Sequence, residues 1–276
     1  MMMMRLVGRS SCRGLARVLV LGGVALMSAV AAQAQFALAV SPPRFELSTA
    51  SGARAREVIE LTHSSAQGGS YEFKTADWTL KPDGSLVFSD DLQPGSCRPW
   101  VAIERRELGL TQGRPYRFRF EVAPPAGAPP MECRFAIMIE GKEAAVPRDV
   151  PIALAARIGV IVYVAVGDVA PALELAGTAI RNVDGRQVPV LKIRNTGTAH
   201  GRLAGFLRAT DVDGTALELQ ADTAPILPGE TREIALTATR PGDTETAVAV
   251  HFPATVEGKL EWGKNGSLPV SQRFEP

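Results

Sequence analysis

The residues that could carry catalytic or metal-binding chemistry are few and widely spaced in this 276-residue chain. The three histidines, His63, His200 and His251, lie far apart and match no metal-ligand spacing. No Gly-x-Ser-x-Gly motif, which would present a nucleophilic serine on a sharp turn, occurs. We therefore expect isolated histidines in strands or loops, no metal site and no enzymatic activity. A secreted hydrolase with a Ser-His-Asp site assembled across the fold stays open as a weaker alternative.

Two motifs resemble ligand-binding loops without completing them. Asp211-x-Asp213-Gly214 begins like a calcium loop, but it lacks the acidic residue at the fifth position and the glycine at the sixth, so a hairpin turn explains it better. Gly258-(x)4-Gly263-Lys264 has the spacing of a phosphate-binding loop, but Asn265 stands where magnesium needs Ser or Thr. We expect no nucleotide or other small-molecule cofactor.

A third feature is a charge inside a long apolar stretch. Residues 149–166 are nearly all apolar and rich in Val and Ile, and they contain the basic residue Arg157. Extended at about 3.3 Å per residue, the stretch would reach about 55 Å, whereas an ordinary strand covers about 17–20 Å. A membrane helix needs about 20 residues and is disfavoured by Pro151, Gly159 and the β-branched residues. The stretch therefore predicts a strand that outruns its domain or has a partner outside the chain.

The N-terminus has the layout of a secretory signal peptide. Four arginines, at positions 5, 9, 13 and 17, precede the apolar run 18–32, and Ala32-Gln33-Ala34 forms a small-x-small cleavage site. We expect residues 1–34 to be removed and the mature chain to be exported to an oxidising compartment. Removing four arginines changes the formal charge from +1 to +1 − 4 = −3. No basic field is then left to bind nucleic acid or anionic lipid.

Cysteine usage agrees with export. Cys97 and Cys133 remain after cleavage, an even pair in an oxidising compartment, and we predict a disulfide between them. The absence of a Cys-x-x-Cys spacing and of a nearby histidine disfavours the alternative of a redox or metal pair.

The rest of the chain has the pattern of an all-β protein. Alternating or continuous apolar segments of strand length recur every 8–14 residues, separated by turn residues such as Lys81-Pro82-Asp83-Gly84. The predicted strands are 53–65, 70–80, 85–90, 116–125 and 132–141, then 172–181, 187–195, 202–211, 231–240, 246–252, 258–263 and 268–274. We predict two β-sandwiches in tandem, residues 35–167 and 168–276, with a hinge near Pro171.

The order of several segments resembles a known family, the periplasmic pilus (fimbrial) assembly chaperones of the chaperone–usher type. The segments are ALAVSPPRFEL, DWTL, SCRPWVAIERRELGLTQG, CRFAIMIEG, PIALAARIGVIVYV, RNTGTAHGRL and PILPGETREIAL. They are spread over essentially the whole mature chain. The resemblance implies two immunoglobulin-like sandwiches set at an angle, with a cleft between them.

The resemblance also implies a mechanism, donor-strand complementation. In such chaperones the last strand of the first domain lends alternate apolar side chains to a pilus subunit that lacks its own final strand. Two basic residues anchor the subunit's C-terminal carboxylate, and by motif they correspond to Arg44 and Arg157. The donor side chains correspond to Val150, Ile152 and Leu154, which share one face of the strand. Alternatively, these side chains fill the domain's own core, and an acidic residue of this chain pairs with Arg157.

The predicted function is thus a non-enzymatic chaperone in fimbrium biogenesis and cell wall organisation. Its expected partners are a pilus subunit with an incomplete immunoglobulin-like fold and an outer-membrane usher, and it could self-associate through the edge strand. The main alternative is a periplasmic adhesion or scaffold module of two immunoglobulin-like domains that never caps a folding subunit.

Overall fold

The structure is a computed structural model that describes residues 37–66, 68–142, 157–183, 185–243 and 245–276. The predicted signal peptide and the predicted donor residues Val150, Ile152 and Leu154 lie outside these ranges. Within them, no helix is long and apolar enough to cross a membrane.

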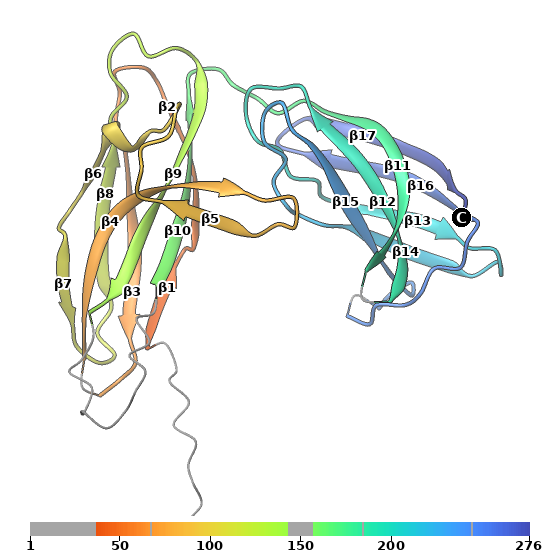
Figure 1. The fold of residues 1–276 in the computed structure, drawn as a ribbon, viewed down its shortest axis with the longest axis horizontal. Helices are drawn as coiled ribbons and strands as arrows, with labels where there is room; N and C mark the ends of the chain where they lie inside the picture. Colours follow the sequence, from red (N-terminus) through yellow and green to blue (C-terminus); the bar gives the residue numbers. More distant parts are fainter. Residues whose placement is uncertain (1–36, 67, 143–156, 184, 244) are drawn as a thin grey trace, which may run out of the picture. The chain divides into compact units, whose positions relative to one another are not determined.

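The strands from residues 38 to 166 form two sheets (Figure 1). The first sheet has the order β1 (Leu38–Ser41), β3 (Ala55–His63), β8 (Tyr116–Val122), β6 (Val101–Ile103). The second has the order β2 (Arg44–Thr49), β10 (Arg157–Val166), β9 (Met131–Gly141), β4 (Gly69–Leu80), β5 (Leu86–Ser89), and β7 (Glu107–Leu110) also pairs with β4. The chain thus changes sheets between β1 and β2, so that β2 lies parallel to β10.

The core of this first sandwich forms because alternate residues of each strand point to the same side of a sheet. Phe118 and Phe120 of β8 face Phe73 and Phe135 of the other sheet, and the Phe73 and Phe118 rings stack 4.2 Å apart. The predicted Cys97–Cys133 disulfide is present and fully within this core. It ties the segment before the short 3-10 turn Arg98–Trp100 to β9.

The strands from residue 173 onward form the second sandwich. Their order is β11 (Leu173–Val183), β12 (Arg186–Asn195), β15 (Thr231–Thr239), β14 (Ala216–Ala221), β13 (Phe206–Thr210), β16 (Ala254–Trp262), β17 (Gly266–Phe274). The first part of β15 pairs with β12 and its last part pairs with β14, so one strand is shared by the two layers. Leucine, isoleucine and valine residues from both layers fill the interior. The predicted all-β fold of two sandwiches is confirmed, and no strand pairing joins them among the described residues.

Most predicted strands are present, but one predicted strand is absent and several observed strands were not predicted. Residues 246–252 alternate in hydropathy and were expected to be a strand, but this prediction is wrong. Val248 and Val250 pack against the core from an irregular segment, so the alternation reflects burial without a hydrogen-bonded ladder. Conversely, the strand β14 was not predicted, although Leu217 and Leu219 on one of its faces are buried.

Candidate functional site

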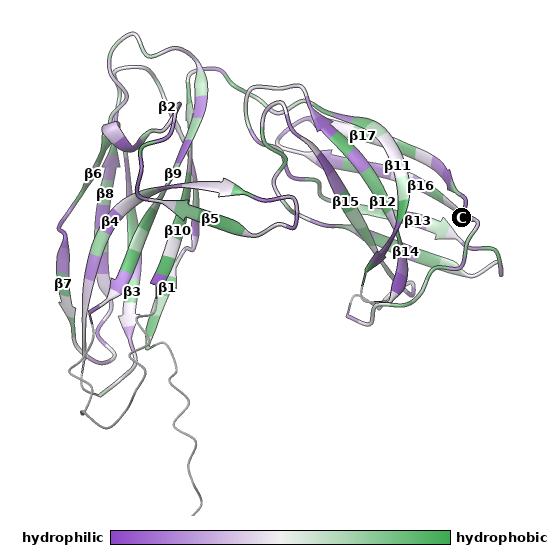
Figure 2. Ribbon diagram, in the orientation of Figure 1, coloured by the Kyte–Doolittle hydropathy of each residue, from purple (hydrophilic) through white to green (hydrophobic). Residues whose placement is uncertain are grey.

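Strand β10 separates two faces along its length. Val160, Val162, Val164 and Val166 are buried in the core of the first sandwich, so this part of the apolar stretch belongs to the protein's own fold. The alternate residues, including Arg157, face away from the core. Figure 2 shows the hydrophobic residues that run along β9 and β10.

Among the described residues, one edge of β10 has no neighbouring strand over its first four residues. On one side, β9 pairs with the whole of β10, from Arg157 to Val166. On the other side, β2 begins only opposite Ile161, where the Ile161 N–H donates to the Pro43 carbonyl. The described residues therefore place no strand beside residues 157–160 on this side. We call residues 157–160 on the β2 side the open edge.

The backbone N–H and C=O groups of successive residues in β10 point alternately to its two sides, and this determines which of them lie at the open edge. The N–H groups of Ile161 and Gly167 both donate toward β2, to Pro43 and Thr49 respectively. Because successive residues of a strand point to opposite sides, the N–H and C=O groups of Arg157 and Gly159 also point to the β2 side, where β2 is absent. An extended peptide could add there by β-augmentation.

The predicted carboxylate anchors Arg44 and Arg157 lie on the same face of this sheet but not side by side. Arg44 is opposite Ile161 in the parallel pair β2–β10, and Ile161 has the same parity as Arg157. Four residues of a strand separate the two positions, which is about 13 Å. A single carboxylate cannot lie beside both backbone positions. The two long arginine side chains, however, extend from the same face of the sheet.

Arg157 has carboxylate partners within its own chain. It lies directly opposite Glu140 in the antiparallel pair β9–β10, and its Nε is 2.8 Å from Glu140 Oε1. A second contact of 3.7 Å reaches Asp90 after β5. Lys74 pairs with the same two carboxylates, those of Asp90 and Glu140. Its hydrogen bond to Asp90 is the main cause that raises its pKa. The Arg157 side chain nevertheless stays 41% exposed, so it is ion-paired and accessible.

Arg44 belongs to a second group of charges around Glu46. The Arg44 Nε is 3.1 Å from Glu46 Oε1, and the same oxygen is 3.5 Å from His200 Nε2 and 3.7 Å from Arg202 Nε. Glu46 therefore contacts basic side chains from β2 and from the segment before β13. Like Arg157, Arg44 is about half exposed and available to an additional anion.

His200 is buried between a carboxylate and an aromatic ring. Its backbone N–H donates to Glu132 Oε1, its Nδ1 is 2.7 Å from Glu132 Oε2, and its ring stacks on Tyr163 at 3.8 Å. Burial raises the pKa of Tyr163 to about 12. This cluster was not predicted from the sequence, because Glu132 and His200 are 68 residues apart.

A hydrophobic patch continues the outer face of β10. Tyr163, Met138 and Trp78 are buried there, and Ile161 and Phe88 pack against them. The phenyl ring of Phe88 lies over Gly159, where an added Cβ would be 2.6 Å from the ring. Gly159 is therefore needed for close approach of β5 to β10, beside the open edge.

The histidines are not isolated as the sequence predicted. His63 Nδ1 and the Tyr71 hydroxyl are 2.6 Å apart in the core, His200 pairs with Glu132, and His251 pairs with Asp213. The expectation fails because strand pairing or a long connection brings each partner close to its histidine. The spacing of residues along the sequence does not reveal these partners. For the turn at Asp213-Gly214 the prediction is confirmed, since Gly214 N–H donates to the Asp211 carbonyl.

Comparisons with known proteins give a likeness of fold only. No protein-family model matches the chain, and no curated protein matches its sequence. Similar solved structures include the class 5 fimbriae chaperone CfaA, with 10% identity over 87% of this chain and 99% of that chain, at a TM-score of 0.47. The Pseudomonas aeruginosa CupB2 chaperone has 12% identity over 86% and 100%, at a TM-score of 0.45. The E. coli chaperone DraB has 15% identity over 87% and 97%, at a TM-score of 0.42.

All three solved structures are named as chaperones, and the first as a fimbriae chaperone. Their identities are far below 25% and their TM-scores are below 0.5, so no functional residue is transferred from them.

Proposed function

We propose that this chain is a periplasmic, non-enzymatic chaperone that binds pilus subunits by donor-strand complementation and hands them to an outer-membrane usher. The open edge of β10 is the observation that carries the proposal. The order of sequence motifs adds independent support, because it resembles the pilus-assembly chaperones along essentially the whole mature chain.

The open edge accounts for part of the binding energy. Arg157 and Gly159 each offer one N–H and one C=O, and each net hydrogen bond contributes about 0.5–1.5 kcal/mol. Four such bonds give about 2–6 kcal/mol, whereas association costs an estimated 4–15 kcal/mol. The edge alone is therefore too short to hold a partner.

The proposed donor residues Val150, Ile152 and Leu154 supply the remainder. Each large apolar side chain that a subunit buries fully contributes about 1.5–3 kcal/mol. Three such side chains, added to the backbone bonds, exceed the lower estimates of the association cost. Hydrophobic donor residues on one parity, followed by a free backbone edge, are what an incomplete sandwich needs for its missing strand.

Arg157 and Arg44 are proposed to bind the C-terminal carboxylate of the subunit. Arg157 must then exchange Glu140 or Asp90 for the incoming carboxylate. An exposed ion pair contributes about 0.2–1 kcal/mol, so this exchange costs little. A bidentate arginine–carboxylate pair that the subunit shields from water is stronger. The present pairing with Glu140 and Asp90 is the state of the free chaperone in this proposal.

Co-purification from periplasm tests the proposal. A tagged wild-type chain is expected to retain a pilus subunit, identified by mass spectrometry, and Arg157→Ala and Arg44→Ala are expected to lose most of it. Arg273→Ala is the matched control, because Arg273 is also exposed and pairs with a single carboxylate, Glu275. A subunit retained equally by all four proteins would contradict the anchor role.

A second pair of variants tests the donor residues separately. Ile152→Asp places a charge on the proposed donor face and is expected to abolish subunit capture. Val183→Asp is its control, since Val183 is an exposed apolar residue of β11 far along the chain. Loss of capture by both variants, or by neither, would favour the adhesion or scaffold module over the chaperone.

A further inference from the structure

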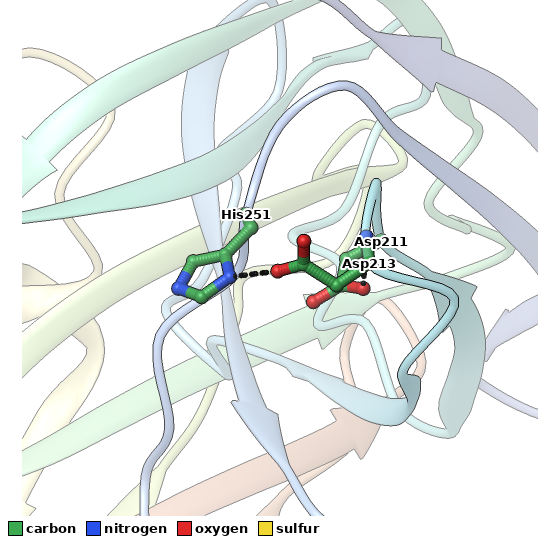
Figure 3. Close-up of side chains that lie close together, drawn as sticks. All are labelled: Asp211, Asp213 and His251. Atoms are coloured by element: carbon green, nitrogen blue, oxygen red, sulfur yellow. Dashed lines mark hydrogen bonds and ion pairs between the residues drawn. The ribbon is translucent and has the colours of Figure 1, made fainter.

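We propose that Asp211, Asp213 and His251 form a binding site for a divalent transition-metal cation, for which Zn²⁺ is the probe. This inference is independent of the proposed chaperone function. Figure 3 shows the three side chains together, with His251 hydrogen-bonded to Asp213 and the Asp211 carboxylate beside them. The potential ligand atoms of the three residues lie within 4.8 Å of one another.

The backbone holds the two segments of the site together. Asp211 and Asp213 belong to the turn between β13 and β14, and His251 lies in the connection before β16. The Val212 N–H donates to the His251 carbonyl at 3.2 Å, which fixes the histidine segment against the turn. The ligands therefore come from two segments 38 residues apart, a pairing that no sequence spacing reveals.

Asp211 is the fixed ligand. It is only 8% exposed, and its Oδ1 accepts the N–H groups of Asp213 and Thr215 at 3.0 and 2.8 Å. Among the described residues, no side chain pairs with its second oxygen. The two hydrogen bonds to Oδ1 fix the orientation of this buried carboxylate, and its second oxygen can bind a metal ion. Metal-binding carboxylates are commonly held in this way by hydrogen bonds to the protein.

The charge balance favours a cation. Among the described residues, no Lys or Arg lies within ion-pairing distance of Asp211 or Asp213, and the partner found for Asp213 is His251. A divalent cation bound between the two carboxylates would neutralise both.

The donor set selects the class of metal. One imidazole nitrogen with two carboxylate oxygens suits zinc and its transition-metal neighbours, whereas calcium and magnesium prefer all-oxygen sites. Zinc bonds of about 2.0–2.2 Å require Asp213 and His251 to separate slightly from their present hydrogen bond. Both side chains are more than half exposed, at 59% and 62%, so they can rotate and the ion can enter from solvent. Water would complete the coordination.

Calorimetric titration of the chelator-treated protein with Zn²⁺ tests the site. We expect one ion per chain, with at least a tenfold loss of affinity in His251→Ala and in Asp211→Asn. The asparagine keeps the oxygen that caps the turn, so this variant should fold. Asp243→Asn is the matched control, because Asp243 also accepts two backbone N–H groups in a turn but has no histidine partner. It is expected to bind Zn²⁺ like the wild type.

Nitrogen NMR of the histidine side chains gives a second readout. Zn²⁺ is expected to shift the ring nitrogens of His251 and to leave those of His63 and His200 unchanged. If His251→Ala and Asp211→Asn bind Zn²⁺ as tightly as the wild type, or if His251 does not shift, the site is not where we place it. Loss of affinity in the Asp243→Asn control would equally overturn it, because the effect would then be one of general charge.

Discussion

The two faces of β10 predict destabilisations of very different size for two substitutions on the same strand. Val162→Ala removes two methyl groups from a side chain that is fully buried in the core. At about 0.8 kcal/mol for each buried carbon, the transfer cost is about 1.6 kcal/mol, and the cavity left behind raises the total to about 2–3 kcal/mol. Arg157→Ala breaks exposed ion pairs with Glu140 and Asp90, and it should cost no more than about 1 kcal/mol.

Urea unfolding followed by tryptophan fluorescence measures both values. Trp78 and Trp100 lie in the first sandwich, and Trp78 packs against Tyr163 of β10, so they report on this strand. Val162→Ala is expected to lower the unfolding midpoint clearly without changing the slope, and Arg157→Ala to leave it nearly unchanged. If Arg157→Ala destabilises the protein as much as Val162→Ala, the arginine is a structural ion-pair partner, and the reasoning about a binding edge is refuted.

Two further predictions concern buried residues of the first sandwich, one pair in its core and one residue on the outer face of β10. Replacing Cys97 and Cys133 by serine should lower the free energy of unfolding by about 4 kcal/mol in the loop-entropy model, because the disulfide spans a separation of 36 residues. Urea unfolding with and without reductant measures this loss. Equal stability under the two conditions would contradict the loop-entropy model. Tyr163 ionises at a pKa of about 12 in the folded state against about 10 when unfolded, so it favours the folded state below pH 10, and this contribution is lost as the pH rises toward 12. Tyr163→Phe should therefore lose less stability than the wild type between pH 10 and 12, and identical pH profiles would show that burial does not perturb this phenol.

The sequence was sufficient for features that depend on local pattern. The turn at Lys81–Gly84 contains Pro and Gly, and Gly84 has the positive φ of 82° that a glycine adopts easily. The pairing of Cys97 with Cys133 followed from their being the two cysteines left after the predicted signal peptide. The apolar stretch around Arg157 was predicted to be a strand, and Arg157–Val166 form β10.

Features that depend on distant pairing could not be predicted. Glu140 is the partner of Arg157 only because β9 and β10 pair in one register, and a shift by one residue would have placed Ile139 there. The site at Asp211, Asp213 and His251 likewise depends on a connection that returns to a turn 38 residues away. The tertiary structure decides which residues become partners in such sites, and residue types alone do not identify them.

Amide hydrogen exchange along β10 is the most direct test of a strand-binding edge. In the free protein, the N–H groups of Ile158 and Val160 point toward β9 and should exchange slowly, while those of Arg157 and Gly159 point to the open edge and should exchange fast. In the complex with the co-purified subunit, we expect Arg157 and Gly159 to become protected as well. Fast exchange at both residues in the complex would show that the partner does not extend this sheet, and it would contradict the account.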